Sequence, residues 1–418
     1  MHYFKYRGKE LYCEGVKVSS IAVKFGTPVY VYSKRTILEH FQKIDKAFKK
    51  ISPLICYSIK ANSNLAILKI LVQVGAGLDI VSGGELYRAR EVKCSSKKIV
   101  YASVGKTEDE IRAAIKYGIL LFNVESFPEL SRINKVAREL RKKVDVALRV
   151  NPDVEPKTHK YIITGKKETK FGMDIDTVRD IFLKRDDFRY LDVCGIHIHI
   201  GSQITQSAPF IKAIKKIKTL IGDLAKKGVD LKYFNIGGGL GIVYDDETPQ
   251  TAEVFAKAVL PMLKDSSLST ILEPGRFIVG NAGIVVTKVS YIKDTPSKNF
   301  IIVDAGMNDL LRPSLYEAYH KIIPVTQNTK HKTRNTKKSD VVGPICESGD
   351  FLGKDRYLNV EEDDYLAVLG AGAYGFSMSS NYNSRPRAVE VLVDGNNVHC
   401  IRKREAYSDL IKGERIVS

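Results

Sequence analysis

The sequence predicts an α/β protein that combines a (β/α)8 TIM-type barrel with a second, mostly β domain. Eight short strand-like runs alternate with amphipathic segments between residues 55 and 274, and eight such repeats in about 220 residues are typical of a closed parallel barrel. After Glu273 the pattern changes to alternating or β-branched runs separated by Gly, Asp and Asn turns. We therefore place the barrel at residues 30–278 and the β domain at residues 1–29 and 279–418.

The predicted barrel strands are short apolar runs. In chain order they are ICYSIK (55–60), LDIVS (78–82), IVYAS (99–103), LLFNV (120–124), VDVALRV (144–150), CGIHIHI (194–200), YFNIG (233–237) and TILEP (270–274). The clearest helix between them is SAPFIKAIKKIKTLIGDLAKKG, where apolar residues recur at helical spacing and lysines occupy the opposite face. Gly228 is its stop signal.

Further segments outside the barrel repeats have patterns that predict local structure. VDGNNV, in the second half of the chain, predicts a β-hairpin, and the strand-like stretch up to about residue 29 is expected to join the β domain. The longest gap between predicted barrel strands contains NPDVEPKTHKYIITGKKETKFG, a polar insertion that predicts a functional or flexible loop.

Composition narrows the class of protein. No apolar run is long enough to span a membrane, and the N-terminus lacks the apolar core of a signal peptide. The six cysteines, at positions 13, 56, 94, 194, 346 and 400, form no CxxC pair. Scattered thiols of this kind fit a reducing compartment and give no zinc signature, so we expect a cytoplasmic protein without a structural metal.

The net charge of +18 does not by itself indicate nucleic acid. The lysines are spread along the chain, and the densest run, TKHKTRNTKK (329–338), has no aromatic residue and is interpreted as a mobile loop. We therefore expect neither a nucleic-acid nor a membrane partner.

Three predicted strand ends carry residues suited to chemistry. Lys60 follows an apolar run, where it either reaches solvent or lies at the mouth of a site. The seventh strand ends in the triplet Gly237, Gly238 and Gly239, and the eighth in EPGR, which spans Glu273 to Arg276. Glycine-rich loops after strands seven and eight are the usual phosphate site of such barrels.

The sixth strand, GIHIHIGSQ, carries two histidines. Ile196, Ile198 and Ile200 fall on one face and suit the layer between barrel and helices, so His197 and His199 point inward. A His-x-His pair could instead bind zinc in a metal-dependent hydrolase, which would require further ligands at other strand ends. The remaining histidines are not at strand ends, which argues against that alternative.

A lysine, a phosphate-binding loop, an imidazole and a carboxylate at neighbouring strand ends match the needs of pyridoxal phosphate (PLP). The lysine amine forms a Schiff base with its aldehyde, a carboxylate keeps its ring nitrogen protonated, and an imidazole can lie against its ring.

The motifs YSIKAN, HIGSQ, EPGR, LLRPSLY, GPICESGD and GAYG resemble those of the diaminopimelate decarboxylase family, fold type III PLP enzymes of the barrel type. The resemblance runs from GTPVYVYS, near residue 26, to GAYGFSMSSNYNSRPR, near residue 387. It implies a barrel plus a β domain, an amino-acid substrate, and a homodimer with shared active sites.

The resemblance implies a set of PLP-binding residues. Lys60 would hold the cofactor, His199 would stack on its ring and Glu273 would pair with its ring nitrogen. Residues near the phosphate would be Ser202, Gly237, Gly238, Gly239 and Gly275, with Arg276 and Tyr374 completing the pocket.

It also implies substrate-binding and catalytic residues. Arg276, Arg312 and Tyr316 would contact a substrate carboxylate, with Tyr374 completing the substrate pocket. Cys346 and Glu347 would come from the other subunit, the cysteine as proton donor and the glutamate as the group that binds the distal amine. Asp79 and Glu85 are interpreted as groups that orient their neighbours.

The expected reaction is decarboxylation of meso-2,6-diaminopimelate to L-lysine and CO2, the last step of bacterial lysine biosynthesis. Its distal amino-acid group requires a cation together with an acid, whereas ornithine or arginine requires only an acid. Carboxynorspermidine also presents a carboxylate and remains an alternative. So does a non-catalytic relative that binds a partner, although such a protein would be expected to lose the lysine, the cysteine or a phosphate glycine.

Overall fold

The computed structural model describes residues 2–155, 169–264, 267–327 and 338–417. These residues form two compact units. The barrel unit contains His40–Ile242 and Thr248–Phe277, and the β unit contains Met1–Glu39, Val243–Glu247 and Ile278–Ser418.

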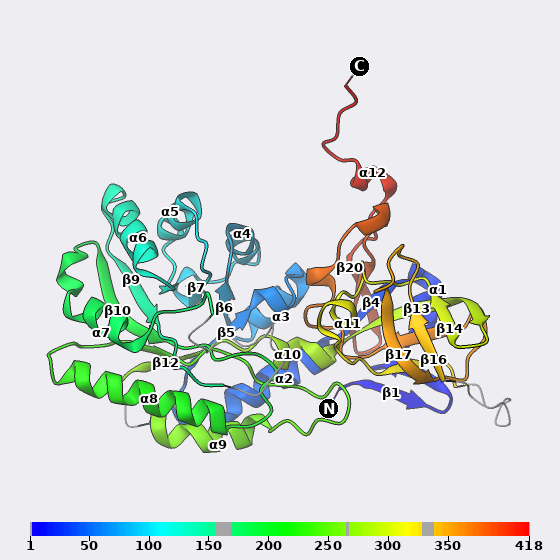
Figure 1. Ribbon diagram of the computed structural model, residues 1–418, viewed down its shortest axis with the longest axis horizontal. Helices are drawn as coiled ribbons and strands as arrows, with labels where there is room; N and C mark the ends of the chain where they lie inside the picture. Colours follow the sequence, from blue (N-terminus) through cyan, green and yellow to red (C-terminus); the bar gives the residue numbers. More distant parts are fainter. Residues whose placement is uncertain (1, 156–168, 265–266, 328–337, 418) are drawn as a thin grey trace. The chain divides into compact units, whose positions relative to one another are not determined.

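The barrel unit is built on eight parallel strands that close on themselves, as predicted (Figure 1). The strands are β5 (Leu54–Ser58), β6 (Gly77–Ile80), β7 (Ile99–Tyr101), β8 (Leu121–Val124), β9 (Val144–Arg149), β10 (Leu191–His197), β11 (Tyr233–Asn235) and β12 (Ser269–Leu272). β12 pairs with β5 to complete the ring. All eight predicted strands are therefore present, each within a few residues of its predicted bounds.

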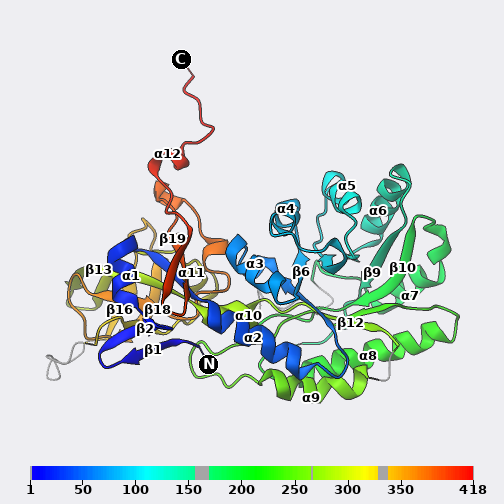
Figure 2. The same ribbon diagram turned by 180° about the vertical axis from the view of Figure 1, so that it is seen from behind.

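Helices surround these strands in both views (Figures 1 and 2). They are α2 (Lys34–Ala47), α3 (Leu65–Gln73), α4 (Gly83–Glu91), α5 (Glu108–Tyr117), α6 (Phe127–Glu139), α7 (Ile175–Leu183), α8 (Ala208–Ala225) and α9 (Ala252–Leu263). α8 is the helix predicted most clearly, and its buried residues include Phe210, Ile214 and Ile217. No helix among the described residues combines the length and apolar character that a membrane span needs.

Several barrel helices begin at a side chain that accepts a backbone hydrogen bond. Ser82, Ser126, Asp174 and Thr251 cap α4, α6, α7 and α9 in this way, and Thr107 forms a capping box with Glu110 at α5. These caps fix the residues at which the helices begin after the preceding loops.

The β unit contains a nine-stranded sheet and a three-stranded sheet. The strands are β1 (Phe4–Arg7), β2 (Glu10–Cys13), β3 (Val16–Lys17), β4 (Val29–Ser33), β13 (Gly283–Asp294), β14 (Asn299–Val303), β15 (Ile322–Pro324), β16 (Lys338–Val342), β17 (Phe351–Tyr357), β18 (Tyr365–Val368), β19 (Val389–Asp394) and β20 (Asn397–Arg402). β19 and β20 form the predicted hairpin around Gly395 and Asn396. The short helices that include residues of this unit are α1 (Val18–Phe25), α10 (Arg276–Val279), α11 (Arg312–Tyr316) and α12 (Tyr407–Leu410).

The N-terminal stretch is not purely strand-like. β1, β2 and β3 are followed by α1, whose Val18, Ile21 and Ala22 are buried against β4 residues such as Val29 and Val31. Their spacing of three and one residues places them on one helical face. β4 itself pairs with β13 and β19 of the β unit.

Two predictions about loops fall on residues that the structure does not describe. Residues 156–168 of the polar insertion and residues 328–337 of the lysine-rich run lie outside the described ranges. The residues on either side of the insertion lie together, because Val150 and Met173 form a parallel bridge directly after β9.

Candidate active site

Lys60 lies directly after the first barrel strand, on the short 3-10 turn Ile59–Ala61 (η1). Its Nζ is 2.9 Å from Oδ2 of Asp79, which is completely buried at the end of β6. The Ser58 hydroxyl donates a 2.6 Å hydrogen bond to the same carboxylate oxygen and lies 3.1 Å from the carbonyl oxygen of Glu273. The lysine amine and the Glu273 segment are therefore neighbours, joined through Ser58.

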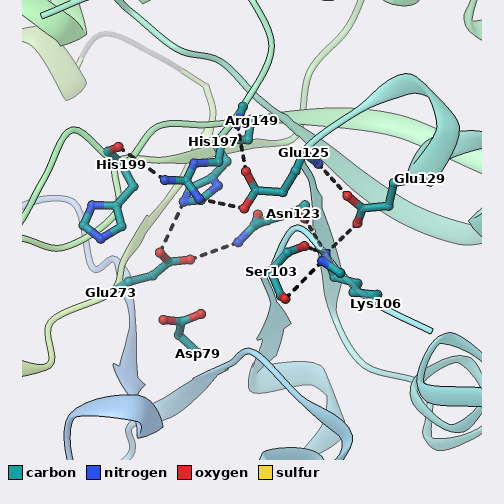
Figure 3. A network of polar contacts seen from close by, with 12 residues as sticks. Asp79, Ser103, Lys106, Asn123, Glu125, Glu129, Arg149, His197, His199 and Glu273 are labelled. Atoms are coloured by element: carbon teal, nitrogen blue, oxygen red, sulfur yellow. Dashed lines mark hydrogen bonds and ion pairs between the residues drawn. The ribbon is translucent and has the colours of Figure 1, made fainter. Parts of the chain in front are cut away.

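The Glu273 side chain is buried and accepts hydrogen bonds from three strands, and Figure 3 shows those from Asn123 and His197. Its Oε1 accepts from the Asn123 amide at 3.0 Å and the Asn235 amide at 2.6 Å, and its Oε2 lies 3.2 Å from His197 Nε2. Burial alone would raise the pKa of this carboxyl, but His197 and the positive charge of Lys60 hold the pKa well below its usual range. Glu273 is thus a buried carboxylate that remains ionised.

His199 follows β10 and carries a neutral imidazole. Burial lowers its pKa well below the ordinary value, and the positive charges of Arg149 and Lys60 lower it further. The Arg149 guanidinium also donates to the His199 carbonyl oxygen at 3.4 Å, which fixes the backbone at this point. An uncharged ring of this kind can pack against a flat aromatic ligand.

The glycine triplet forms a loop in which no side chain fits. A Cβ on Gly237 would lie 2.4 Å from the Ile198 carbonyl oxygen, and one on Gly238 would lie 2.0 Å from that of Glu273. Gly239 adopts a φ of +107°, which disfavours other residues. Asn235 connects this loop to Glu273, because its Oδ1 accepts from the Gly237 N–H at 2.9 Å. Tightly packed glycine backbone of this type is suited to binding anions.

Two more predicted residues meet beside this loop. The Arg276 guanidinium donates to the Ser202 hydroxyl through Nε at 3.2 Å and through Nη2 at 3.1 Å, and Arg276 itself is buried. A Cβ on Gly275 would contact Cβ of Ser58 at 3.0 Å, so this glycine lets the EPGR turn approach the lysine strand. The barrel unit therefore brings together every predicted site residue that belongs to it.

A chain of buried ion pairs lies behind the carboxylate (Figure 3). Lys106 Nζ is 2.6 Å from Glu129 Oε1 and also donates to the Asn123 carbonyl at 2.9 Å. Glu129 accepts from the Glu125 N–H at 2.9 Å, and the Glu125 carboxylate pairs with Arg149 at 2.6 Å. The network thus connects the strand that carries Asn123 with the arginine that contacts His199.

The remaining predicted residues lie in the β unit. Arg312 and Tyr316 are the first and last residues of α11, and Arg312 is buried. Tyr374 adopts a positive φ of 57°. Cys346 and Glu347 have exposed side chains on the loop between β16 and β17.

Hydrogen bonds hold the backbone of this loop, and its Ile345 is buried. Buried Asp350 accepts from the Ile345 N–H at 2.6 Å, and Asn383 Oδ1 accepts from the Cys346 N–H at 2.8 Å. The Tyr382 hydroxyl donates to the Glu347 carboxylate. The backbone beneath Cys346 and Glu347 is therefore fixed while both side chains face outward.

Sequence reasoning did not identify Asn123 and Asn235 as partners of the carboxylate. Both lie within apolar strand runs. A buried amide inside a barrel strand needs a polar partner, so the position of each asparagine in its run indicates a hydrogen bond inside the barrel. His197 was expected to point inward, but its contact with Glu273 was not anticipated. The network of Lys106, Glu129 and Glu125 gave no recognisable motif.

Comparison with known proteins shows the family to which the chain belongs. A profile described as "Pyridoxal-dependent decarboxylase, pyridoxal binding domain" matches residues 34–280. The chain belongs to the pyridoxal-dependent decarboxylases. A diaminopimelate decarboxylase from Aquifex aeolicus is 51% identical over 98% of this chain and 97% of its own length. One from Pseudomonas aeruginosa is 47% identical over 100% of both chains.

Solved structures give the same assignment. Diaminopimelate decarboxylase from Helicobacter pylori, complexed with L-lysine, has a TM-score of 0.90 and 41% identity over 94% of this chain and 98% of its own. The enzyme from M. jannaschii, also in complex with L-lysine, has a TM-score of 0.93 and 39% identity over 99% and 98%. The chain is a PLP-dependent carboxy-lyase of this family.

The barrel residues fit PLP. Lys60 offers an amine, the glycine loop leaves no room for a Cβ where an anion would bind, and ionised Glu273 can hold a proton on a ring nitrogen. Lys60, Glu273 and the loop are connected through Ser58 and Asn235. The cofactor predicted from the sequence is thus compatible with the observed geometry.

Substitution of Gly238 by Ala tests the loop. A Cβ at this position would lie 2.0 Å from the Glu273 carbonyl oxygen, so the loop must shift. We expect PLP affinity to fall by at least about tenfold, measured by fluorescence titration of cofactor-free protein. Gly222→Ala on α8 is the control, because its Cβ would have no neighbour within 4 Å and PLP binding should be unchanged. Equal affinities for the two variants would contradict the assignment.

Glu85, the first-turn acid of α4, gives a pH prediction. Burial raises the pKa of its carboxyl from 4.5 to about 7, although the hydrogen bond from the Val81 N–H and the charge of Lys60 lower it. Because the pKa of Glu85 is higher in the folded state than in the unfolded state, protonation of Glu85 stabilises the fold, fully so below pH 4.5. This stabilisation is lost as the pH rises through 7. Glu85→Gln should remove that loss.

Urea unfolding of cofactor-free protein between pH 4 and 8 is the measurement. The free energy of unfolding of Glu85→Gln should rise relative to the unsubstituted protein across this window, by at most about 3 kcal/mol. Glu91→Gln, an exposed position on the same helix, should follow the unsubstituted protein throughout. Parallel curves for all three proteins would show that Glu85 does not titrate in this way.

Proposed function

We propose that this protein decarboxylates meso-2,6-diaminopimelate to L-lysine and CO2, the final step of lysine biosynthesis, in the cytoplasm. The observation that carries the proposal is the position of the Lys60 amine, which Asp79 holds beside the Glu273 segment and whose positive charge helps to keep the Glu273 carboxylate ionised. Full-length identity to relatives named diaminopimelate decarboxylase supports the choice of reaction.

The barrel residues would bind and orient the cofactor. PLP, when bound, supplies the ring that accepts the electron pair left by the departing carboxyl group. Lys60 would bind it and then return to release the product, and Asp79 would hold the lysine amine between these steps. Glu273 would keep a proton on the ring nitrogen, since its own pKa is too low for it to take that proton away. His199 would cover the ring face and exclude water.

The β unit would supply residues for the substrate. We propose that Cys346 donates the proton that replaces the carboxyl group, and that Glu347 binds the distal amine, both from the second subunit of a homodimer. Arg312 with Tyr316, together with Arg276, would contact a substrate carboxylate, and Tyr374 would complete the pocket. The exposure of Cys346 and Glu347 on a fixed loop supports a role toward a partner chain.

The distal end of the substrate argues for diaminopimelate. That end carries an ammonium and a carboxylate, so its pocket needs an acid and a cation, which Glu347 and Arg312 would provide. An arginine buried opposite a substrate without a carboxylate would face a costly mismatch. The solved relatives in complex with L-lysine contain a ligand that carries both groups.

Spectroscopy and a substrate panel test the proposal. Purified protein with PLP should absorb visible light, lose this band on borohydride reduction, and release CO2 from meso-diaminopimelate in preference to ornithine, arginine or carboxynorspermidine. Lys60→Ala should lack both the band and the activity, because it removes the amine proposed to bind the cofactor aldehyde. A colourless protein that PLP does not reconstitute, or CO2 release from ornithine alone, would contradict the assignment.

Mixed dimers test whether active sites are shared. Lys60→Ala and Cys346→Ala proteins should each be inactive or nearly so. After mixing and subunit exchange, half of the dimers should contain one complete site, which restores about a quarter of the original activity. Recovery should be absent when either variant is mixed with itself, and no recovery in the mixture would place Cys346 in its own subunit's site or outside the mechanism.

A further inference from the structure

Three side chains of the β unit contact one another, namely Arg312, Tyr244 and His320. The Arg312 guanidinium lies over the Tyr244 ring, 4.8 Å from the centroid, and its Nε donates to His320 Nε2 at 3.3 Å. The rings of Tyr244 and His320 meet edge to face, with 5.2 Å between centroids. His320 is completely buried and Arg312 almost so. No motif singled out His320 or Tyr244.

Two hydrogen-bond contacts of the His320 ring specify a single protonation state. A guanidinium nitrogen can only donate, so Nε2 of His320 must accept and carry no proton. On the other side of the ring, Nδ1 lies 2.8 Å from the Leu369 carbonyl oxygen, which can only accept, so Nδ1 must carry the proton. Both contacts therefore require the same neutral tautomer.

The strand pairing fixes where this imidazole lies. β15 and β18 are antiparallel, with Ile322 opposite Val368, and the Leu369 N–H extends the pairing by donating to the Lys321 carbonyl at 2.8 Å. His320 and Leu369 thus lie just beyond the paired strands. On the other side, Gly370 makes room for the Tyr244 ring, since a Cβ there would lie 3.2 Å from it.

We propose that His320 is a positioning residue that directs the Arg312 guanidinium toward the distal carboxylate of the substrate. This inference rests on the proposed function. A carboxylate binds a guanidinium best through two parallel N–H groups, which requires a fixed guanidinium plane. The Nε bond to His320 and the Tyr244 face set that plane, and with Nε–H directed at His320 the carboxylate would meet the Nη edge.

Two substitutions separate the functions of the two ring nitrogens. The amide of Asn reaches the place of Nδ1, so His320→Asn can keep the bond to Leu369 but loses the acceptor for Arg312. The amide oxygen of Gln reaches the place of Nε2, so His320→Gln keeps that acceptor. Exposed His399 on β20 provides the matched control, His399→Asn.

The measurement compares two diamines that differ only in a carboxylate. L-lysine and cadaverine are titrated into the same PLP-loaded sample of each variant, and binding is followed by the visible spectrum of the cofactor. His320→Asn should weaken L-lysine binding by about tenfold and leave cadaverine unchanged, because one charge-assisted contact is disordered. His320→Gln and His399→Asn should bind both as the unsubstituted enzyme does. An unfolded fraction in the preparation would lower the amplitude of both titrations but would not shift the midpoint of either.

Kinetics and NMR complete the test. For meso-diaminopimelate, His320→Asn should raise KM by about tenfold with kcat within about twofold, since ground-state and transition-state contacts are lost alike. The 15N shifts of His320 in the holoenzyme should show a protonated Nδ1 and an unprotonated Nε2. Equal effects on both diamines, or a proton on Nε2, would overturn the inference while the enzyme still released CO2. Absence of CO2 release by the unsubstituted enzyme would instead refute the proposed function, and the carboxylate role with it.

Discussion

The barrel depends on the burial of one ionised carboxylate. A charged group away from water is tolerated only when its oxygens are hydrogen-bonded, and Glu273 meets this condition through Asn123, Asn235 and His197. These partners come from β8, β11 and β10, while Glu273 follows β12. A slip of one residue in any of these strands would turn a partner to the opposite face. The requirement to satisfy Glu273 therefore fixes the mutual register of half the barrel, and with it the loop that begins at Gly237.

The ion pairs behind the site are better explained by position than by stability. Replacing a buried salt bridge with apolar residues is often neutral or stabilising, so the pairing of Lys106 with Glu129 contributes little by itself. Its geometry, however, ties the Asn123 backbone to the Glu125 backbone, and Glu125 orients Arg149 (Figure 3). Arg149 in turn helps to keep the adjacent His199 neutral. One network thus supports both the amide that holds Glu273 and the uncharged ring.

The limits of sequence-based prediction here follow from the range of the interactions. Alternation of apolar runs and amphipathic helices is a local signal, and it predicted all eight barrel strands and the presence of chemistry at their ends. The partners of Glu273 are different, because Asn123 lies 150 residues away from it in the chain and only barrel closure makes them neighbours. The helix α1 was missed for a local reason, since its β-branched residues also suit a strand. Motif resemblance identified Arg312 as a site residue. It did not identify His320, because the position of that side chain depends on where two strands end.

The loop of Cys346 connects the architecture of the β unit to the proposed assembly. Asp350 is buried so that it can accept backbone N–H groups of Ile345 and Met307, and Asn383 accepts that of Cys346. A surface loop needs no such internal bonding to remain soluble, and ordering it costs conformational entropy. A preorganised loop loses less entropy when a partner chain binds. The cost of ordering this loop is therefore explained if the exposed thiol and carboxylate contact groups on another chain. The rigidity of this backbone beneath exposed reactive side chains therefore supports a shared active site more strongly than their exposure alone.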